Sequence, residues 1–140
     1  MDYITRSTKE TEKVAIGLAI TLRKGNAVAL YGDLGSGKTT FTNFLVKALG
    51  LNARVQSPTF VIARKYKSDS LEVNHVDLYR LTSADEIKDI GIEEILKEKG
   101  AITVIEWPEL VEEFLPKNTI RIKFEYIDEN SRKISIHNLY

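Results

Sequence analysis

The stretch Gly32–Thr40, GDLGSGKTT, contains residues whose types and spacing are suited to holding phosphates. It matches the pattern G-x-x-x-x-G-K-[S/T], with Gly32, Gly37, Lys38 and Thr39 at the fixed positions. The glycines let backbone N–H groups turn toward an anion without a Cβ clash, and the lysine can reach the β and γ phosphates. The threonine hydroxyl can ligate Mg²⁺. The stretch therefore predicts a nucleotide site in which Lys38 acts on the phosphates.

A hydrolytic site also needs a carboxylate on the metal ion, commonly at the end of a neighbouring apolar strand. Glu106 ends the stretch AITVIE, and Asp77 ends VNHVD. Uncharged, mostly apolar residues precede Glu106 and Trp107-Pro108 follows it, which favours Glu106 as the metal ligand. Asp77 would then orient the attacking water or a metal-bound water. The alternative for each acid is an ordinary strand end facing solvent, and His75 could either help position Asp77 or be structural.

A threonine between the loop helix and the next strand is a further candidate. In small nucleotide switches this interval holds a threonine that senses the γ-phosphate, and Thr59 in the stretch SPTF takes that place here. The alternative is a Ser-Pro turn after which Phe60 enters the core. Both interpretations stay open on the local pattern.

The motifs that identify GTP readers are missing, which favours ATP as the nucleotide. The sequence has no D-x-x-G, and histidine replaces the lysine of N-K-x-D in the stretch NHVD, residues 74–77. A small-molecule kinase is an enzymatic alternative, and it normally needs an arginine-bearing lid and a second-substrate domain. Arg80 is available, but the sequence shows no lid insertion.

The spacing of apolar residues predicts the elements that must position these groups. Capping boxes at Ser7 and Ser83 begin two of the helices. We expect helices at 8–23, 39–49, from 83 to the interruption at Gly91, 92–99 and 109–114, and strands at 27–31, 60–67, 71–79, 101–105, 119–126 and 132–136. The sequence thus predicts one α/β domain over residues 1–140, with three layers, a largely parallel central sheet and a C-terminal β-hairpin.

Composition excludes several classes of function. The 140 residues carry 20 basic and 20 acidic side chains, so non-specific nucleic-acid binding is not the expected function. The lack of cysteine excludes disulfides, thiolate zinc sites and cysteine nucleophiles, and fits a reducing cytosol. The apolar stretch 14–22 is too short to span a bilayer and has charges on both sides, so it predicts a helix. A cytoplasmic protein without membrane contact is expected.

The stretches GDLGSGKTT, SPTF, HVDLYRL and IEW, in this order within one small chain, resemble the TsaE family, also called YjeE. The resemblance runs from the Ser7–Thr11 segment to the region of Arg132. This family is the ATPase component of the bacterial machinery that makes N6-threonylcarbamoyladenosine on tRNA. The resemblance implies a P-loop NTPase fold, ATP and Mg²⁺ as ligands, and the proteins TsaD and TsaB as partners. Because the net charge is zero, tRNA is expected to be contacted only indirectly.

The resemblance also implies roles for individual residues. The residues that match the phosphate loop are Gly32, Asp33, Leu34, Gly35, Ser36, Gly37, Lys38 and Thr39, and Thr40 is a further expected cofactor-binding residue. Thr39 and Glu106 match the Mg²⁺ ligands of the family. Thr59 matches its switch threonine. Asp77 and Trp107 match residues linked to hydrolysis or nucleotide contact, so Lys38, Asp77 and Glu106 form the expected catalytic set.

Three more residues match positions near the nucleotide in this family: Thr8, Thr11 and Arg132. A role in the helix start is the alternative for the two threonines, and exposed charge on a hairpin is the alternative for the arginine. ATP binding or hydrolysis would drive a conformational or reset step of the TsaB–TsaD complex, because a partner that binds one nucleotide state is released when the state changes. Weak hydrolysis alone, stimulated by partners, is expected. A nucleotide-dependent binding module without obligatory hydrolysis is the alternative from another class.

Overall fold

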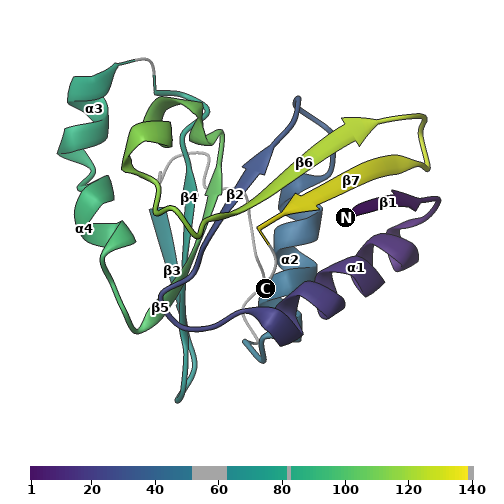
Figure 1. Cartoon of the computed structure of the whole chain (residues 1–140), viewed down its shortest axis with the longest axis horizontal. Coiled ribbons are helices and arrows are strands. Elements are labelled where there is room, and N and C mark those ends of the chain that lie inside the picture. Colours follow the sequence, from purple (N-terminus) through teal and green to yellow (C-terminus); the bar gives the residue numbers. More distant parts are fainter. Residues whose placement is uncertain (52–62, 82, 139–140) are drawn as a thin grey trace.

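The computed structural model describes residues 1–51, 63–81 and 83–138, and Thr59 lies outside these residues. Within them, seven strands form one sheet in the order β1-β7-β6-β2-β5-β4-β3 (Figure 1). The strands are β1 Asp2–Thr5, β2 Ala27–Tyr31, β3 Ala63–Lys67, β4 Glu72–Asp77, β5 Ala101–Glu106, β6 Ile120–Tyr126 and β7 Arg132–His137.

The centre of the sheet is parallel and both edges are antiparallel. β6, β2, β5 and β4 run in the same direction, whereas β3 pairs antiparallel with β4, and β7 pairs antiparallel with β6 and β1. Every residue of β5 is buried, and so is every residue of β2 before Tyr31, because helices cover parallel strands on both faces. The predicted largely parallel centre and the C-terminal β-hairpin are confirmed.

Helices form a layer on each face of the sheet (Figure 1). The helices are α1 Thr8–Thr21, α2 Lys38–Ala48, α3 Ala84–Asp89, α4 Ile92–Leu96 and the 3-10 helix η1 Pro108–Phe114. Leu18 of α1 and Phe41 of α2 belong to one apolar core with β2, β6 and β7. Ile87 of α3 and Val111 of η1 belong to a second core on the other face. The two cores confirm the three layers.

The predicted helix boundaries follow from local chemistry. The Ser7 hydroxyl accepts a hydrogen bond from the backbone N–H of Glu10 at 3.2 Å, and the Ser83 hydroxyl accepts one from Glu86 at 3.3 Å. Both helices therefore begin with the predicted caps. Gly91 has a φ of 69°, a left-handed conformation that ends α3 and separates it from α4.

Two elements differ from the sequence prediction. β1 is not foreseen, because four residues reading DYIT show too little alternation to predict a strand. The expected helix at 109–114 is a 3-10 helix that begins one residue earlier, with Pro108 in its first turn. Residues 60–62 of the expected third strand lie outside the described residues.

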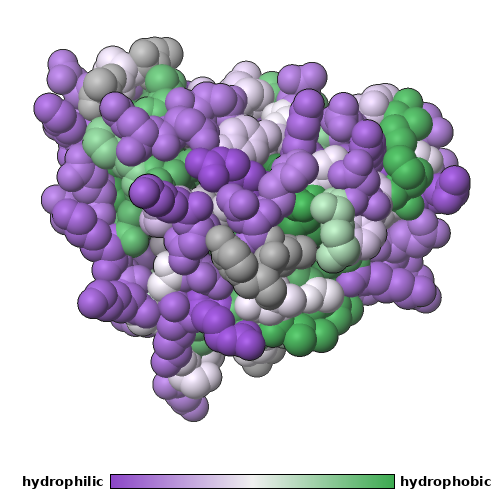
Figure 2. Space-filling view, viewed as in Figure 1, coloured by the Kyte–Doolittle hydropathy of each residue, from purple (hydrophilic) through white to green (hydrophobic). Residues whose placement is uncertain are grey.

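The surface fits the balanced composition. The face seen in Figure 2 is mostly hydrophilic, with separate apolar areas between the polar side chains. In α1, Ala15 and Leu18 are buried in the core, whereas Ile20 is 73% exposed. Among the described residues, no helix has the length and apolar character needed to cross a membrane.

Candidate functional site

The loop between β2 and α2 has the backbone shape that its glycines predict. Gly32, Gly35 and Gly37 all have positive φ angles, of 146°, 77° and 103°. A Cβ atom at Gly32 would lie 2.7 Å from the carbonyl oxygen of Phe124 and 2.7 Å from the Ser36 hydroxyl. Any other residue at Gly32 would therefore displace the loop from β6. The loop leads into the N-terminus of α2, where backbone N–H groups and the helix dipole favour an anion.

Lys38, the first residue of α2, is folded back over the loop. Its side chain is 5% exposed, and its ammonium donates a hydrogen bond to the carbonyl oxygen of Gly32 at 2.5 Å. The same ammonium lies 3.7 Å from the centre of the Trp107 ring. Burial lowers the pKa of Lys38, and the negative charges of Glu106 and nearby acids oppose that shift. A phosphate entering the loop would give this buried cation a better acceptor than a neutral carbonyl oxygen.

Thr39 and Glu106 come together at the end of the loop. The Thr39 hydroxyl lies 3.1 Å from Oε1 and 3.4 Å from Oε2 of Glu106, whose side chain is 3% exposed. The parallel pairing of β2 with β5 produces this contact, because it places the end of β5 beside the start of the loop.

The oxygen donors of this pair fit Mg²⁺, which is usually held by one or two carboxylates together with substrate phosphates. Among the described residues, no group of three or more histidines, cysteines or acids could hold a metal ion by itself. Thr39 and Glu106 would therefore hold Mg²⁺ only together with a bound nucleotide.

Asp77 ends β4 beside the same corner of the sheet. Its register partner on β5 is Glu106, so the two acids lie on neighbouring strands and on one face. Its carboxylate accepts a hydrogen bond from the backbone N–H of Tyr79 at 3.0 Å. The loop hydroxyl of Thr39 contacts Glu106, which supports the preference for Glu106 as the metal ligand.

His75 lies in β4, two residues before Asp77. Its ring is completely buried, and Nε2 lies 2.5 Å from Oε2 of Glu106. The sequence suggested that His75 could position Asp77, and the structure places the imidazole against the other acid. The contact depends on the register of β4 and β5, in which His75 is paired with Val104, two residues before Glu106.

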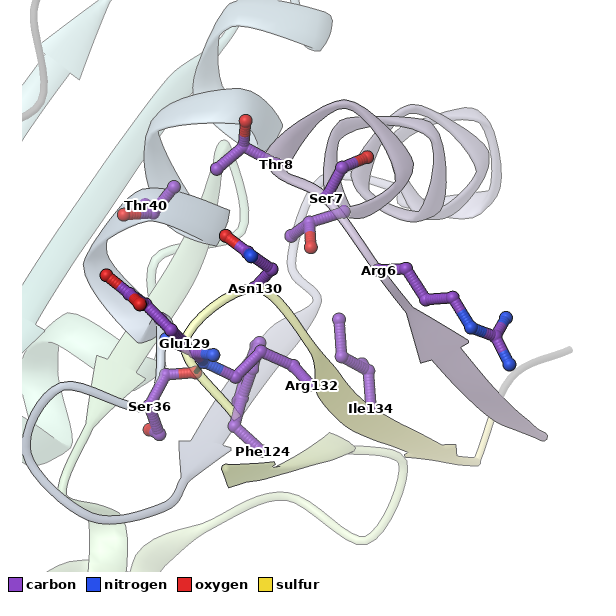
Figure 3. A pocket seen from close by; sticks show the side chains of 12 residues that line it. Arg6, Ser7, Thr8, Ser36, Thr40, Phe124, Glu129, Asn130, Arg132 and Ile134 are labelled. Carbon is purple, nitrogen blue, oxygen red and sulfur yellow. Dashed lines mark hydrogen bonds between the residues drawn. The ribbon is translucent and has the colours of Figure 1, made fainter. Parts of the chain in front are cut away.

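A cavity of about 270 Å³ opens beside the loop (Figure 3). Ser36, Gly37 and Thr40 form its loop side. The other lining residues are Arg6, Ser7, Thr8, Thr11, Phe124, Glu129, Asn130, Arg132 and Ile134. The structure thus brings Thr8, Thr11 and Arg132 to one cavity with the phosphate loop.

Arg132, at the start of β7, donates hydrogen bonds to the phosphate loop. Its Nε donates to the carbonyl oxygen of Ser36 at 3.1 Å, and its Nη2 donates to that of Gly35 at 3.4 Å. The guanidinium also lies 4.7 Å from the centre of the Tyr126 ring. These bonds show that Arg132 is more than an exposed charge on a hairpin, because they connect β7 to two carbonyl groups of the loop.

Sequence reasoning missed several lining residues. Glu129 and Asn130 belong to the turn between β6 and β7, which the sequence places far from the loop. Their side chains lie around the same cavity as Thr8 and Thr40 (Figure 3). No local signal could have found them, because the turn reaches the loop only through the pairing of β6 with β2.

Thr11, a predicted site residue, is buried, and its hydroxyl donates to the hydroxyl of Thr5 at 2.9 Å.

Trp107 offers a direct optical test of nucleotide binding. It is the only tryptophan of the chain, and its ring contacts the Lys38 ammonium and the ring of Tyr79. ATP should draw Lys38 toward the phosphates and so change the tryptophan fluorescence. We expect a saturable change on addition of ATP, absent in Lys38→Ala. An emission spectrum that stays constant while calorimetry reports binding would contradict this geometry.

Comparison with known proteins gives consistent results. The chain matches the family model "Threonylcarbamoyl adenosine biosynthesis protein TsaE" over residues 5–134. It is 40% identical over 138 residues to the tRNA threonylcarbamoyladenosine biosynthesis protein TsaE of Rickettsia bellii, covering 98% of this chain and 94% of that protein. The protein of the same name from Bacillus subtilis is 36% identical over 135 residues, covering 96% and 84% of the two chains. A crystal structure of Bacillus subtilis YdiB aligns with a TM-score of 0.77 at 29% identity, covering 97% of this chain and 83% of that one.

Proposed function

Because this chain belongs to the TsaE family of tRNA threonylcarbamoyladenosine biosynthesis, we propose that it is the ATPase of that system. The observation that carries the proposal is the contact between Thr39 and Glu106 next to the buried Lys38. A hydroxyl, a carboxylate and an ammonium converge there on a loop shaped for phosphates. A simple phosphate-binding turn would not need a buried acid at that place.

Different residues of the site would bind different parts of the ATP–Mg²⁺ complex. The backbone N–H groups at the start of α2 and the Lys38 ammonium would hold the phosphates. Thr39 and Glu106 would hold Mg²⁺, which when bound would neutralise charge on the phosphates. Asp77 would orient the attacking water, because its carboxylate lies beside Glu106 on the neighbouring strand. Trp107 would pack beside the phosphate end through its contact with Lys38.

The cavity beside the loop would receive the nucleoside part of ATP. Ser36 and Gly37 line the cavity and also belong to the phosphate loop, and Thr40 lines it from the first turn of α2, so the two regions are continuous. Thr8 and Arg132 would then lie near the nucleoside. The cavity volume of about 270 Å³ lies just below the usual range for ligand sites, and the open side of the cavity would leave part of the nucleoside exposed.

The proposed purpose of hydrolysis is to reset the TsaB–TsaD complex in the cytoplasm. A partner that binds the ATP state more tightly than the ADP state is released when ATP is hydrolysed. Thr59 would report the γ-phosphate to that partner, as the family resemblance implies. The bound tRNA would be handled by the partners.

The test is ATP hydrolysis by the purified chain, alone and with TsaB and TsaD. We expect slow turnover alone and faster turnover with both partners present, and the Glu106→Gln chain should lose both. If that variant still supported tRNA modification at the wild-type rate, the chain would be a nucleotide-dependent binding module. Activity that ignores the partners but requires an added small molecule would indicate a kinase.

A further inference from the structure

Among the residues that the structure describes at this corner, His75 is the one buried titratable residue to which the proposed chemistry gives no role. Its side chain is 0% exposed and lies in the interior of β4. Along β4, residues two apart face the same side of the sheet, so His75 shares a face with Val73, which packs in the core beneath α1 and α2. Val104 of β5 is the register partner of His75, and Glu106 lies two residues after Val104. Glu106 is therefore on the same face of the sheet as His75.

The Glu106 carboxylate is held between two groups. Oε2 lies 2.5 Å from Nε2 of His75, and the hydroxyl of Thr39 lies 3.1 Å from Oε1 and 3.4 Å from Oε2. Oε2 is therefore the oxygen held by His75, and Oε1 is the oxygen nearer the phosphate-loop hydroxyl. A glutamate at a strand end could otherwise adopt several rotamers, and these two contacts select one of them.

The chemistry of the contact fixes the position of the imidazole proton. An ionised carboxylate can only accept hydrogen bonds, so Nε2 of His75 must carry the proton that it shares with Glu106. Among the described residues, Nδ1 of His75 is buried and has no hydrogen-bond partner. With the proton on Nε2, Nδ1 is left as an unpaired acceptor, whereas a proton on Nδ1 would bury an unpaired donor.

A purely structural role does not account for this arrangement. A histidine with an unsatisfied nitrogen is a poor choice for a strand face that also carries the buried Val73 and Val104, since a buried polar atom without a partner destabilises the fold. An aliphatic side chain would fill the same place without that penalty. The hydrogen bond that Nε2 donates to the Glu106 carboxylate explains why histidine occupies this position.

We propose that His75 is a positioning residue that holds the Glu106 carboxylate with Oε1 turned toward Thr39 and the phosphate loop. His75 thereby sets the affinity of the site for Mg²⁺ without contacting the ion. The inference rests on the proposed function, because it assumes that Thr39 and Glu106 hold the metal. Groups that orient a metal ligand in this way typically change metal affinity by about 10- to 100-fold.

Three substitutions separate positioning from packing. The amide nitrogen of His75→Gln can reach the place of the imidazole Nε2, so this variant should keep near wild-type metal affinity. The shorter side chain of His75→Asn cannot reach Glu106, and His75→Leu has no donor. We expect both to weaken Mn²⁺ binding by about 10- to 100-fold. His137→Gln is the matched control, because His137 is the only other histidine and is exposed on β7.

The measurement is an electron paramagnetic resonance titration of Mn²⁺ into the complex of chain and ATP. Calorimetry in EDTA measures ATP binding without metal, which should be the same in all variants. Thermal unfolding shows whether each variant is folded. Loss of Mn²⁺ affinity in His75→Leu with an unchanged or raised melting temperature would establish a role beyond packing.

Nitrogen-15 spectra of the histidine rings give an independent readout without nucleotide or metal. With two histidines in the chain, His137→Gln assigns both spin systems. We expect the His75 ring to be protonated at Nε2, and protonation at Nδ1 alone would overturn the proposal.

The failures of the two proposals are distinguishable. Equal Mn²⁺ affinity in the wild type and His75→Leu, with ATP bound by both, would overturn the role of His75 and leave the proposed function standing. A wild-type chain that binds no ATP would overturn both.

Discussion

Replacing Lys38 with alanine should weaken ATP binding by about a hundredfold while leaving the chain folded. A hydrogen bond to a charged group contributes about 1.5–3 kcal/mol, and a tenfold change in affinity corresponds to about 1.4 kcal/mol. The ammonium of Lys38 is buried against Gly32 and Trp107, where water competes poorly with a phosphate. Burial lowers the pKa of Lys38, so the fold itself does not favour this charge and should tolerate its removal. Calorimetric titration with ATP measures the affinity.

Lys47→Ala is the matched control for Lys38→Ala. Lys47 is in the last turn of the same helix, where its side chain is exposed. Its removal changes the net charge by the same amount at a distance from the loop, so ATP affinity should stay within about twofold, as expected for a screened surface charge. Unchanged ATP binding by Lys38→Ala would show that the loop does not hold the phosphates.

The part of the site that the sequence could predict is local. β2, the glycine loop and α2 follow one another along the chain, and the positive φ angles of Gly32 and Gly37 are what the glycine pattern requires. Glu106 could be identified as a strand-end acid because the apolar residues before it indicate a buried strand. Its contact with Thr39 then follows from the neighbouring positions of β2 and β5.

The remaining parts depend on pairings between distant segments. Arg132 reaches the loop because β7 pairs with β6 and β6 pairs with β2. The hairpin of β6 and β7 could be predicted, but the pairing of β6 with β2 has no local signature. His75 could be placed on a strand from the sequence, but its contact with Glu106 requires the register of β4 against β5. A shift of one residue in that register would turn His75 to the opposite face. β1 is too short to show a pattern, and it is recognised only by its pairing with β7.

Replacing Glu106 with glutamine should lower ATP hydrolysis at least a hundredfold, with little loss of ATP binding in the absence of metal. Each tenfold change in rate corresponds to about 1.4 kcal/mol of barrier, and loss of charge stabilisation at a metal site is worth several kcal/mol. The amide keeps the size of the carboxylate and can still accept from His75, so the fold should be retained. The negative charge of Glu106 also acts on Lys38, so its removal should not weaken the attraction of ATP. Single-turnover hydrolysis with Mg²⁺ and calorimetry in EDTA measure the two effects separately.

Two other variants test whether the loss of ATP hydrolysis is caused by the contacts that Glu106 makes. Glu109→Gln removes an exposed acid from η1 whose charge also acts on Lys38, and it should hydrolyse ATP at close to the wild-type rate. Glu106→Ala leaves the Nε2 proton of His75 without an acceptor, so it should be less stable than Glu106→Gln by about 1–3 kcal/mol. Wild-type hydrolysis by Glu106→Gln would exclude this carboxylate from the reaction. Asp77, its neighbour on β4, would then be the acid that remains to bind the metal.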